Sequence, residues 1–223
     1  MRMPLPLEPD LEGMVGEQQR TNLLPALRLW LSGDGPEVIY VYGEPGCGRT
    51  YMMMACQRWL EEHGHGHDMF YVSLQEEGLE VSVLDGLERY QWLFMDHVET
   101  VQGQVKWETA LFELCNRHQG HNLLIAGRVL PGQACIIPDL ASRWMGGLVY
   151  AMGGWNDDEL GEFLAQAAAQ RGLRLSTEQR TYILQRGSRS PGGLLRFLDQ
   201  LDHYTLQEKR PVTLPVLRAL LDR

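Results

Sequence analysis

Short apolar runs alternate with amphipathic segments along the first part of the chain. The runs are rich in β-branched and aromatic residues, which predicts strands at EVIYVYG (37–43), MFYVSL (69–74), WLFMD (92–96), NLLIAG (122–127) and GLVYAM (147–152). Helical spacing predicts helices at 23–31, from Thr50 to about His63, and at 107–118. Because apolar strands that alternate with helices are typical of sheets buried on both faces, the pattern predicts an α/β fold with a parallel sheet flanked by helices.

From Asn156 onward the pattern is helical. An acidic helix start at NDDEL (156–160) is followed by a capping box from Ser176 to Gln179, and two further helical stretches are LLRFLDQLD (194–202) and TLPVLRALL (213–221). The sequence therefore predicts three parts, which are an extended tail over 1–10, an α/β domain over 11–152 and a small all-α domain over 153–223.

Composition restricts the classes of function. The 223 residues are 44% hydrophobic and carry a formal net charge of −9. Broad binding to nucleic acids or membrane surfaces needs basic patches, so this acidic balance argues against both. No apolar run is long enough for a membrane span or a signal peptide. The four cysteines lack metal-ligand or disulfide-framework spacing, which predicts reduced thiols in a cytoplasmic protein.

The stretch GEPGCGRT (43–50) fits the phosphate-loop pattern G-x-x-x-x-G-[KR]-[ST] between a predicted strand and a predicted helix. Backbone N–H groups of such a loop surround phosphates, and the helix N-terminus adds positive potential. Asp96 ends the strand WLFMD, where its carboxylate and the Thr50 hydroxyl would hold Mg²⁺. The alternative is a coincidental glycine turn. The expected nucleotide contacts are Gly43, Pro45, Gly46, Cys47, Gly48, Arg49, Thr50 and Asp96.

Two residues beside this loop differ from those of efficient ATPases. Arg49 stands where the pattern usually has lysine, and its planar guanidinium cannot act as a compact point charge on the terminal phosphates. His97 follows Asp96 at a position that is usually acidic in enzymes that polarise an attacking water. We therefore expect nucleotide binding to be retained better than hydrolysis.

Several stretches together resemble one family. They are the phosphate loop, WLFMDHVE (92–99), ALFELCNR (110–117), IPDLASRW (137–144) and LDQLD (198–202). In combination they are similar to the DnaA-type AAA+ ATPases, and within them to regulatory inactivators of the replication initiator DnaA. The resemblance covers essentially the whole chain and implies an AAA+ domain followed by a helical lid. The chain ends where the initiator would continue into a DNA-binding domain, so no direct sequence-specific DNA binding is expected.

The tail MRMPLPLEPD carries apolar residues between prolines, which prevent a helix and favour an extended chain. The family resembled here has an N-terminal peptide Q-L-x-L-P-L that binds the sliding clamp of the replicase. The resemblance implies clamp contacts at Met3, Leu5, Pro6 and Leu7, with Arg2 in the glutamine position. A proline-stiffened peptide loses little entropy when its side chains fill pockets. A proline-rich tail without a partner is the alternative.

The resemblance also implies an arginine finger. Arg143 in DLASRW matches the arginine that AAA+ proteins present to the ATP of a neighbouring subunit, where it stabilises charge on the transferred phosphoryl group. A simple ion pair is the alternative. The family's aromatic-valine pair, beside which the adenine lies, corresponds to Met14 and Val15.

Two further positions depart from the family. Arg128 stands at a polar sensor position where related proteins have aspartate, and Gly192 stands where the lid arginine is expected. Arg189 and Arg196 are the nearby candidates to replace that arginine. These changes cluster on self-hydrolysis, so the resemblance implies a protein that holds an adenine nucleotide, expected to be ADP, as a conformational ligand.

The sequence thus favours a negative regulator of replication initiation, which binds the clamp and stimulates ATP hydrolysis by DnaA through Arg143. Two rivals stay open. A self-contained P-loop ATPase would hydrolyse ATP alone and lose that activity on Asp96→Ala. A tethering module would need Leu5 and Leu7 but not Arg143. The sequence also leaves open whether the protein forms homo-oligomers.

Overall fold

The computed structural model describes residue 11 and residues 19–153, 155–208 and 211–221. Within them lies a five-stranded sheet with the order β2-β3-β4-β1-β5, in which each pair of neighbours is parallel. The strands are β1 (Val38–Tyr42), β2 (Met69–Ser73), β3 (Trp92–Asp96), β4 (Asn122–Gly127) and β5 (Leu148–Ala151). The predicted parallel sheet is confirmed, and its strand bounds agree with the apolar runs to within a residue or so.

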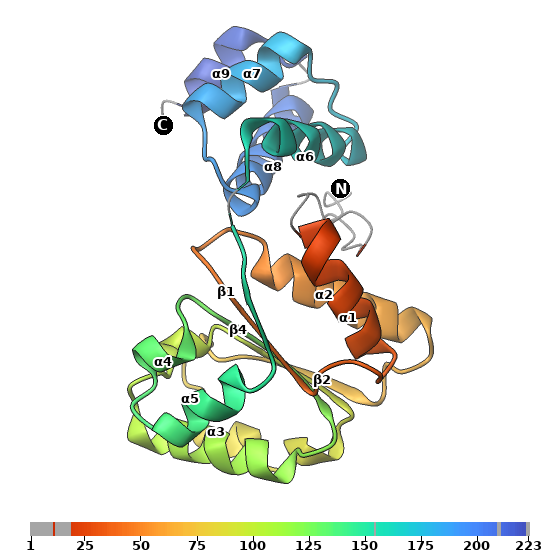
Figure 1. Cartoon of the computed structure of the whole chain (residues 1–223). Coiled ribbons are helices and arrows are strands. Elements are labelled where there is room, and N and C mark those ends of the chain that lie inside the picture. Colours follow the sequence, from red (N-terminus) through yellow and green to blue (C-terminus); the bar gives the residue numbers. More distant parts are fainter. Residues whose placement is uncertain (1–10, 12–18, 154, 209–210, 222–223) are drawn as a thin grey trace.

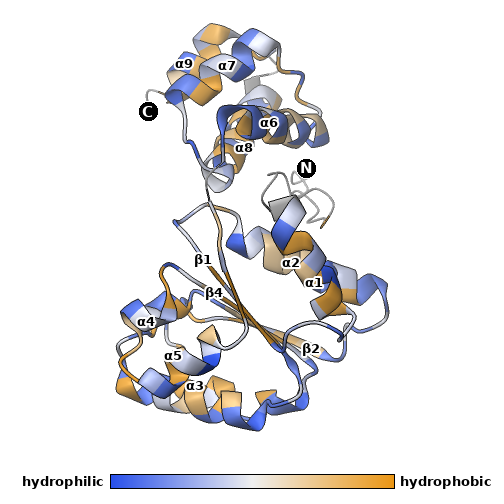
Figure 2. Ribbon diagram, viewed as in Figure 1, coloured by the Kyte–Doolittle hydropathy of each residue, from blue (hydrophilic) through white to orange (hydrophobic). Residues whose placement is uncertain are grey.

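Helices cover both faces of the sheet (Figure 1). On one face a single apolar core joins the sheet to α1 (Leu24–Leu31) and α2 (Arg49–Glu62). A second core joins the other face to α3 (Val105–Arg117) and α5 (Pro138–Met145), with the short α4 (Pro131–Ala134) beside α5. Strands β3 and β4 are buried along their whole length because both faces are covered, which explains their unbroken apolar sequence (Figure 2).

The connections contain four short helical turns, which are η1 (Gln19–Leu23), η2 (Val81–Leu84), η3 (Leu87–Arg89) and η4 (Val98–Thr100). The segments α4 and α5 were not among the predicted helices. They have four and eight residues, so each presents too few turns for an apolar period to stand out from the sequence. No helix of the described residues is long and apolar enough to cross a membrane.

Four helices follow the sheet and share a third apolar core. They are α6 (Asp157–Gln170), α7 (Thr177–Arg186), α8 (Pro191–Glu208) and α9 (Leu214–Leu221). The predicted capping box at Ser176 and Gln179 is present, and Asn156 with Glu159 forms a second one at the start of α6. Both boxes satisfy backbone N–H groups that a helix start otherwise leaves unpaired. The predicted all-α lid is confirmed.

The lid reaches the sheet domain at the phosphate loop. The N–H of Gly192, in the first turn of α8, donates to the carbonyl of Gly46 at 2.9 Å. A Cβ atom added to Gly192 would lie 3.0 Å from the Cα atom of Gly46, so the two backbones are in direct contact. This contact sets the lid beside the carboxyl end of the sheet, where α8 approaches the loop between β1 and α2 (Figure 1).

Candidate functional site: a phosphate loop and a remote arginine

The phosphate loop connects β1 to α2, and its glycines have backbone reasons to be glycine. Gly46 and Gly48 have φ values of 85° and 107°, in the left-handed region that residues with a Cβ atom rarely adopt. A Cβ atom on Gly43 would lie 2.1 Å from the carbonyl oxygen of Met152. The α2 helix begins at Arg49 without a side-chain cap, so its first N–H groups are available to an anion.

Asp96 is fully buried at the end of β3 and faces the first turn of α2. Its carboxylate accepts hydrogen bonds from the Thr50 hydroxyl at 2.7 Å, the Tyr71 hydroxyl at 3.2 Å and the His97 N–H at 2.8 Å. Burial and the neighbouring Asp96 charge raise the pKa of Tyr71, so its phenol stays a donor. The paired Thr50 and Asp96 oxygens are ligands of the kind that Mg²⁺ prefers, and bound Mg²⁺ would screen phosphate charge.

Arg49 does not extend freely toward the cavity. Its guanidinium donates to the carbonyl of Gly127, at the end of β4, and its Nη2 atom lies 3.5 Å from the Glu99 Oε1 atom. The side chain is 7% exposed. Cys47, two residues before Arg49 in the loop, is also buried. Burial raises the pKa of its thiol, and the Arg49 charge opposes that rise. Arg49 therefore anchors the loop to the sheet.

The segment after β3 turns sharply. His97 has a φ of 57°, the only positive value of a non-glycine residue in the described part of the chain. Its Nδ1 atom lies 3.3 Å from the Ser73 hydroxyl oxygen. The turn at His97 brings Glu99, two residues later, to the wall of a cavity between the phosphate loop and the lid. Arg128, which follows β4, also lines this cavity and pairs with Glu44 at 3.8 Å.

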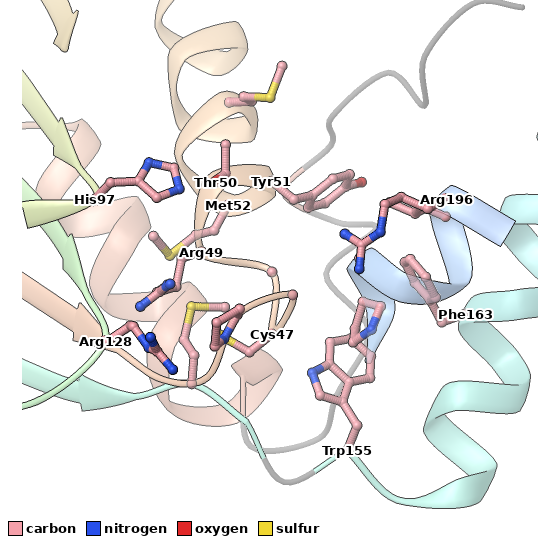
Figure 3. A pocket seen from close by; sticks show the side chains of 18 of the residues that line it. Cys47, Arg49, Thr50, Tyr51, Met52, His97, Arg128, Trp155, Phe163 and Arg196 are labelled. Carbon is pink, nitrogen blue, oxygen red and sulfur yellow. The ribbon is translucent and has the colours of Figure 1, made fainter. Parts of the chain in front are cut away.

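The cavity between the phosphate loop and the lid has a volume of about 710 Å³. One wall consists of the loop and of Arg49, His97 and Arg128, while the opposite wall carries Trp155, Phe163 and Arg196 (Figure 3). The Trp155 and Phe163 rings pack edge to face, with centroids 5.8 Å apart. The site thus combines a polar end at the sheet with an aromatic wall from the lid, a combination that suits a phosphate-bearing, ring-containing ligand.

The lid arginines differ in their partners. Gly192 touches Gly46 so closely that any side chain at this position would push the two backbones apart. Arg189 pairs with Asp157, and Arg171 binds Asp199 at 2.7 Å. Arg196 lies one helical turn after Gly192 and lines the cavity, and no described carboxylate forms an ion pair with it.

Arg143 lies at the other end of the sheet. It is exposed on α5, and no carboxylate of the described residues pairs with it. Together with Val38, at the start of β1, it lines a second cavity of about 500 Å³. The phosphate loop follows the opposite end of β1, about 16 Å away at about 3.3 Å per residue. Arg143 therefore lies at the end of the sheet opposite the chain's own phosphate loop, a feature that the sequence left undetermined.

Two buried side chains fix the helix that carries Arg143. Glu108 on α3 is fully buried and accepts hydrogen bonds from the N–H groups of Gly103, Ile136 and Ile137 at 2.6, 3.1 and 2.7 Å. Ile137 is the N-cap of α5 and supplies no side-chain cap of its own, so Glu108 caps α5 from a neighbouring helix. Sequence reasoning missed this role, because the only signal was an acidic residue in a predicted helix.

Trp144 fixes the other side of α5. Its ring is fully buried and stacks on Tyr40 of β1, with centroids 5.7 Å apart. The Tyr40 hydroxyl donates to the carbonyl of Val129 at 2.9 Å. Helix α5 thus rests on the strand that leads to the phosphate loop.

Six predicted site residues lie outside the described part of the chain. They are the clamp-binding Met3, Leu5, Pro6 and Leu7 and the adenine-flanking Met14 and Val15. Of the remaining predicted residues, the structure brings the loop residues, Thr50 and Asp96 together at one site and sets Arg143 apart from them.

Comparisons with known proteins give the family. The model described as "Hda, lid domain" matches residues 157–221. A protein of Haemophilus influenzae, described as uncharacterized, is 30% identical over 230 residues, covering 99% of this chain and 98% of that protein. Domain III of the replication initiation protein DnaA from Thermotoga maritima superimposes with a TM-score of 0.81 at 18% identity, covering 98% of each chain.

The chain belongs to the Hda family of DnaA-related AAA+ proteins. Two further structures share the fold of this Hda-family chain. AMPPCP-bound DnaA from Aquifex aeolicus has a TM-score of 0.74 at 17% identity, covering 92% of this chain and 70% of that one. The RuvB Holliday junction branch migration motor of Thermotoga maritima has a TM-score of 0.72 at 18% identity, covering 96% and 71%. Membership in the Hda family makes this protein a DnaA-related replication regulator.

The cap of α5 yields a first testable prediction. Glu108→Ala leaves three backbone N–H groups without their acceptor, and we expect it to lower the free energy of unfolding by about 3 kcal/mol or more. Urea unfolding measures this loss, and hydrogen exchange should accelerate at Ile136 and Ile137. Glu113→Ala, an exposed site on the same helix, is the control and should cost under about 0.5 kcal/mol. Equal losses in the two variants would contradict the capping role.

Proposed function

We propose that this Hda-family protein stimulates ATP hydrolysis by DnaA through Arg143, as a nucleotide-loaded protein bound to the sliding clamp. The observation that carries the proposal is the exposed Arg143, which has no ion pair among the described residues and lies at the opposite end of β1 from its own phosphate loop. An arginine in this position is too far from its own phosphate loop to serve it, which supports a role at the nucleotide of another molecule. Stimulated ATP hydrolysis by DnaA would switch off initiation once clamps are loaded on DNA.

The chain's own site supports a role as holder of a ligand. Arg49 is bound to Gly127 and Glu99, so it does not supply a free cation to a terminal phosphate. His97 takes part in a turn and interacts with Ser73. Because neither residue is arranged as the usual lysine or water-polarising carboxylate would be, self-hydrolysis is expected to be slow. The rival self-contained ATPase would require efficient chemistry from this site.

The proposed ligand is an adenine nucleotide, ADP, with Mg²⁺ between Thr50 and Asp96. The left-handed glycines and the uncapped start of α2 offer N–H groups to the phosphates. The proposed adenine contacts, Met14 and Val15, stay a prediction from the family resemblance. The sheet domain would then extend over 11–152 and the lid over 153–223, with the cavity between them.

Clamp binding is proposed for the tail over 1–10. Leu5, Pro6 and Leu7 match the family's clamp-binding peptide, and Met3 stands in for its first leucine. A proline-stiffened peptide has little conformational entropy to lose on docking. In the rival tethering function the same residues would act, and Arg143 would be dispensable.

The finger is tested on ATP preloaded on the cognate DnaA, with DNA-loaded clamp present. The unchanged protein should accelerate hydrolysis, and Arg143→Ala should remove the acceleration, because trans arginines contribute about 10³- to 10⁵-fold in rate. Arg58→Ala is the control, since Arg58 is a partly exposed arginine on α2, on the other face of the sheet. Acceleration that survives in Arg143→Ala, or is absent in the unchanged protein despite clamp binding, would favour the tethering module.

The tail is tested by direct binding to the purified clamp. Replacing Leu5 and Leu7 together by alanine should weaken binding by about 100-fold or more, because two buried leucines each contribute about 1.5–3 kcal/mol. Glu8→Ala, just outside the matched peptide, should change little. Arg2→Gln should strengthen binding by restoring the amide of the family pattern. A double variant that binds as tightly as the unchanged protein would remove the clamp from the proposal.

Arg196 is tested by nucleotide titration. Arg196→Ala should weaken ADP binding by about tenfold or more, because a hydrogen bond to a charged group contributes about 1.5–3 kcal/mol. The matched control is Arg189→Ala on the same segment, since Arg189 already pairs with Asp157 outside the cavity lining. If the two variants bind ADP equally well, Arg196 does not contact the nucleotide.

A further inference from the structure

A carboxylate lies inside the proposed nucleotide cavity. Glu99, in the turn η4, is 18% exposed and lines the cavity beside the phosphate loop. Its Oε1 atom lies 3.5 Å from the Arg49 Nη2 atom. Its Oε2 atom is buried and has no hydrogen-bond partner among the described residues. A buried carboxylate oxygen without a donor is unusual, because desolvation of a charge is costly unless it is compensated.

Glu99 lies near the place that the terminal phosphate of a bound nucleotide would occupy. The Mg²⁺-binding end of a phosphate loop is marked here by Thr50 and Asp96, and Arg49 adjoins Thr50 in the chain. Arg49 links Glu99 to this end. In a nucleotide bound along the loop, the third phosphate of a triphosphate would therefore lie closer to the Glu99 carboxylate than the two phosphates of a diphosphate.

The two arginines on this wall carry no uncompensated positive charge for a third phosphate. The guanidinium of Arg49 is shared between Glu99 and the Gly127 carbonyl. Arg128, the other basic residue on this wall, pairs with Glu44. Each of the two arginines is thus matched by a carboxylate, and the Asp96 charge remains in addition. Repulsion between charges is strong at short range in a partly buried site.

We propose that Glu99 sets a preference of this site for a nucleoside diphosphate over a triphosphate. The third phosphate would add negative charge next to a carboxylate whose arginine partner is already engaged. A diphosphate would leave that space free and would keep the contact between Arg49 and Glu99. This inference rests on the proposed binding of a nucleotide at the phosphate loop. It makes the Glu99 side chain the determinant of the relative affinities for diphosphate and triphosphate.

The test compares the affinities for ADP and for AMPPCP, a triphosphate analogue, by isothermal titration in the presence of Mg²⁺. The unchanged protein should bind ADP more tightly. Glu99→Gln keeps the shape of the side chain but removes its charge and releases Arg49. The ratio of the AMPPCP affinity to the ADP affinity should rise by about tenfold or more. Glu99→Ser, a smaller neutral substitution, should shift the ratio in the same direction.

Glu77→Gln is the matched control, because it makes the same change in net charge at an exposed residue outside the cavity lining. This variant should leave the ratio unchanged. The inference is overturned if the Glu99 variants keep the ratio of the unchanged protein, or if they raise or lower both affinities equally. Failure of the unchanged protein to bind either nucleotide would instead overturn the proposed nucleotide binding itself, so the two failures are distinguishable.

Discussion

The buried carboxylate of Asp96 joins three neighbouring segments at the carboxyl edge of the sheet. It accepts hydrogen bonds from Thr50 on α2, from Tyr71 on β2 and from the backbone of His97. A buried charge is tolerated only where donors surround it, so these three contacts must form together. They fix the first turn of α2 against β3, and this in turn fixes the phosphate loop that precedes α2. The geometry of the whole candidate site follows from that arrangement.

The opposite edge of the sheet depends on a second buried carboxylate. Glu108 caps α5 from α3, and the stacking of Trp144 on Tyr40 holds α5 to β1. The two edges are physically connected, because Tyr40 donates to the Val129 carbonyl, two residues after the Gly127 carbonyl that accepts from Arg49. A continuous set of contacts therefore runs from the phosphate loop to the helix that presents the proposed finger.

The sheet was predictable from the sequence because buried parallel strands leave unbroken apolar runs, as in WLFMD and NLLIAG. The lid helices were predictable from long periodic segments and from the capping box at Ser176. The short α5 was not, since its eight residues owe their place to Glu108 and Trp144, which are contacts between distant parts of the chain. The candidate site likewise contains features that a local motif predicts and features that it does not. The loop motif predicted that Thr50 and Asp96 meet, whereas the position of Glu99 depends on a left-handed turn at His97 that no motif signals.

The distribution of arginine partners gives the clearest physical distinction between holding a nucleotide and hydrolysing one. On the sheet side of the cavity, Arg49 and Arg128 are matched by Glu99 and Glu44. On the lid side Arg171 is matched by Asp199, whereas Arg196 has no carboxylate partner among the described residues. Cations whose charge is already compensated gain little from the charge that develops on a phosphoryl group in the transition state, so they contribute little to catalysis. Arg143, by contrast, is exposed and has no such partner among the described residues. An uncompensated arginine on the outer surface can respond to a phosphate brought by another molecule. This difference supports the proposal that the chain holds a nucleotide at its own site and acts on the nucleotide of another molecule through Arg143.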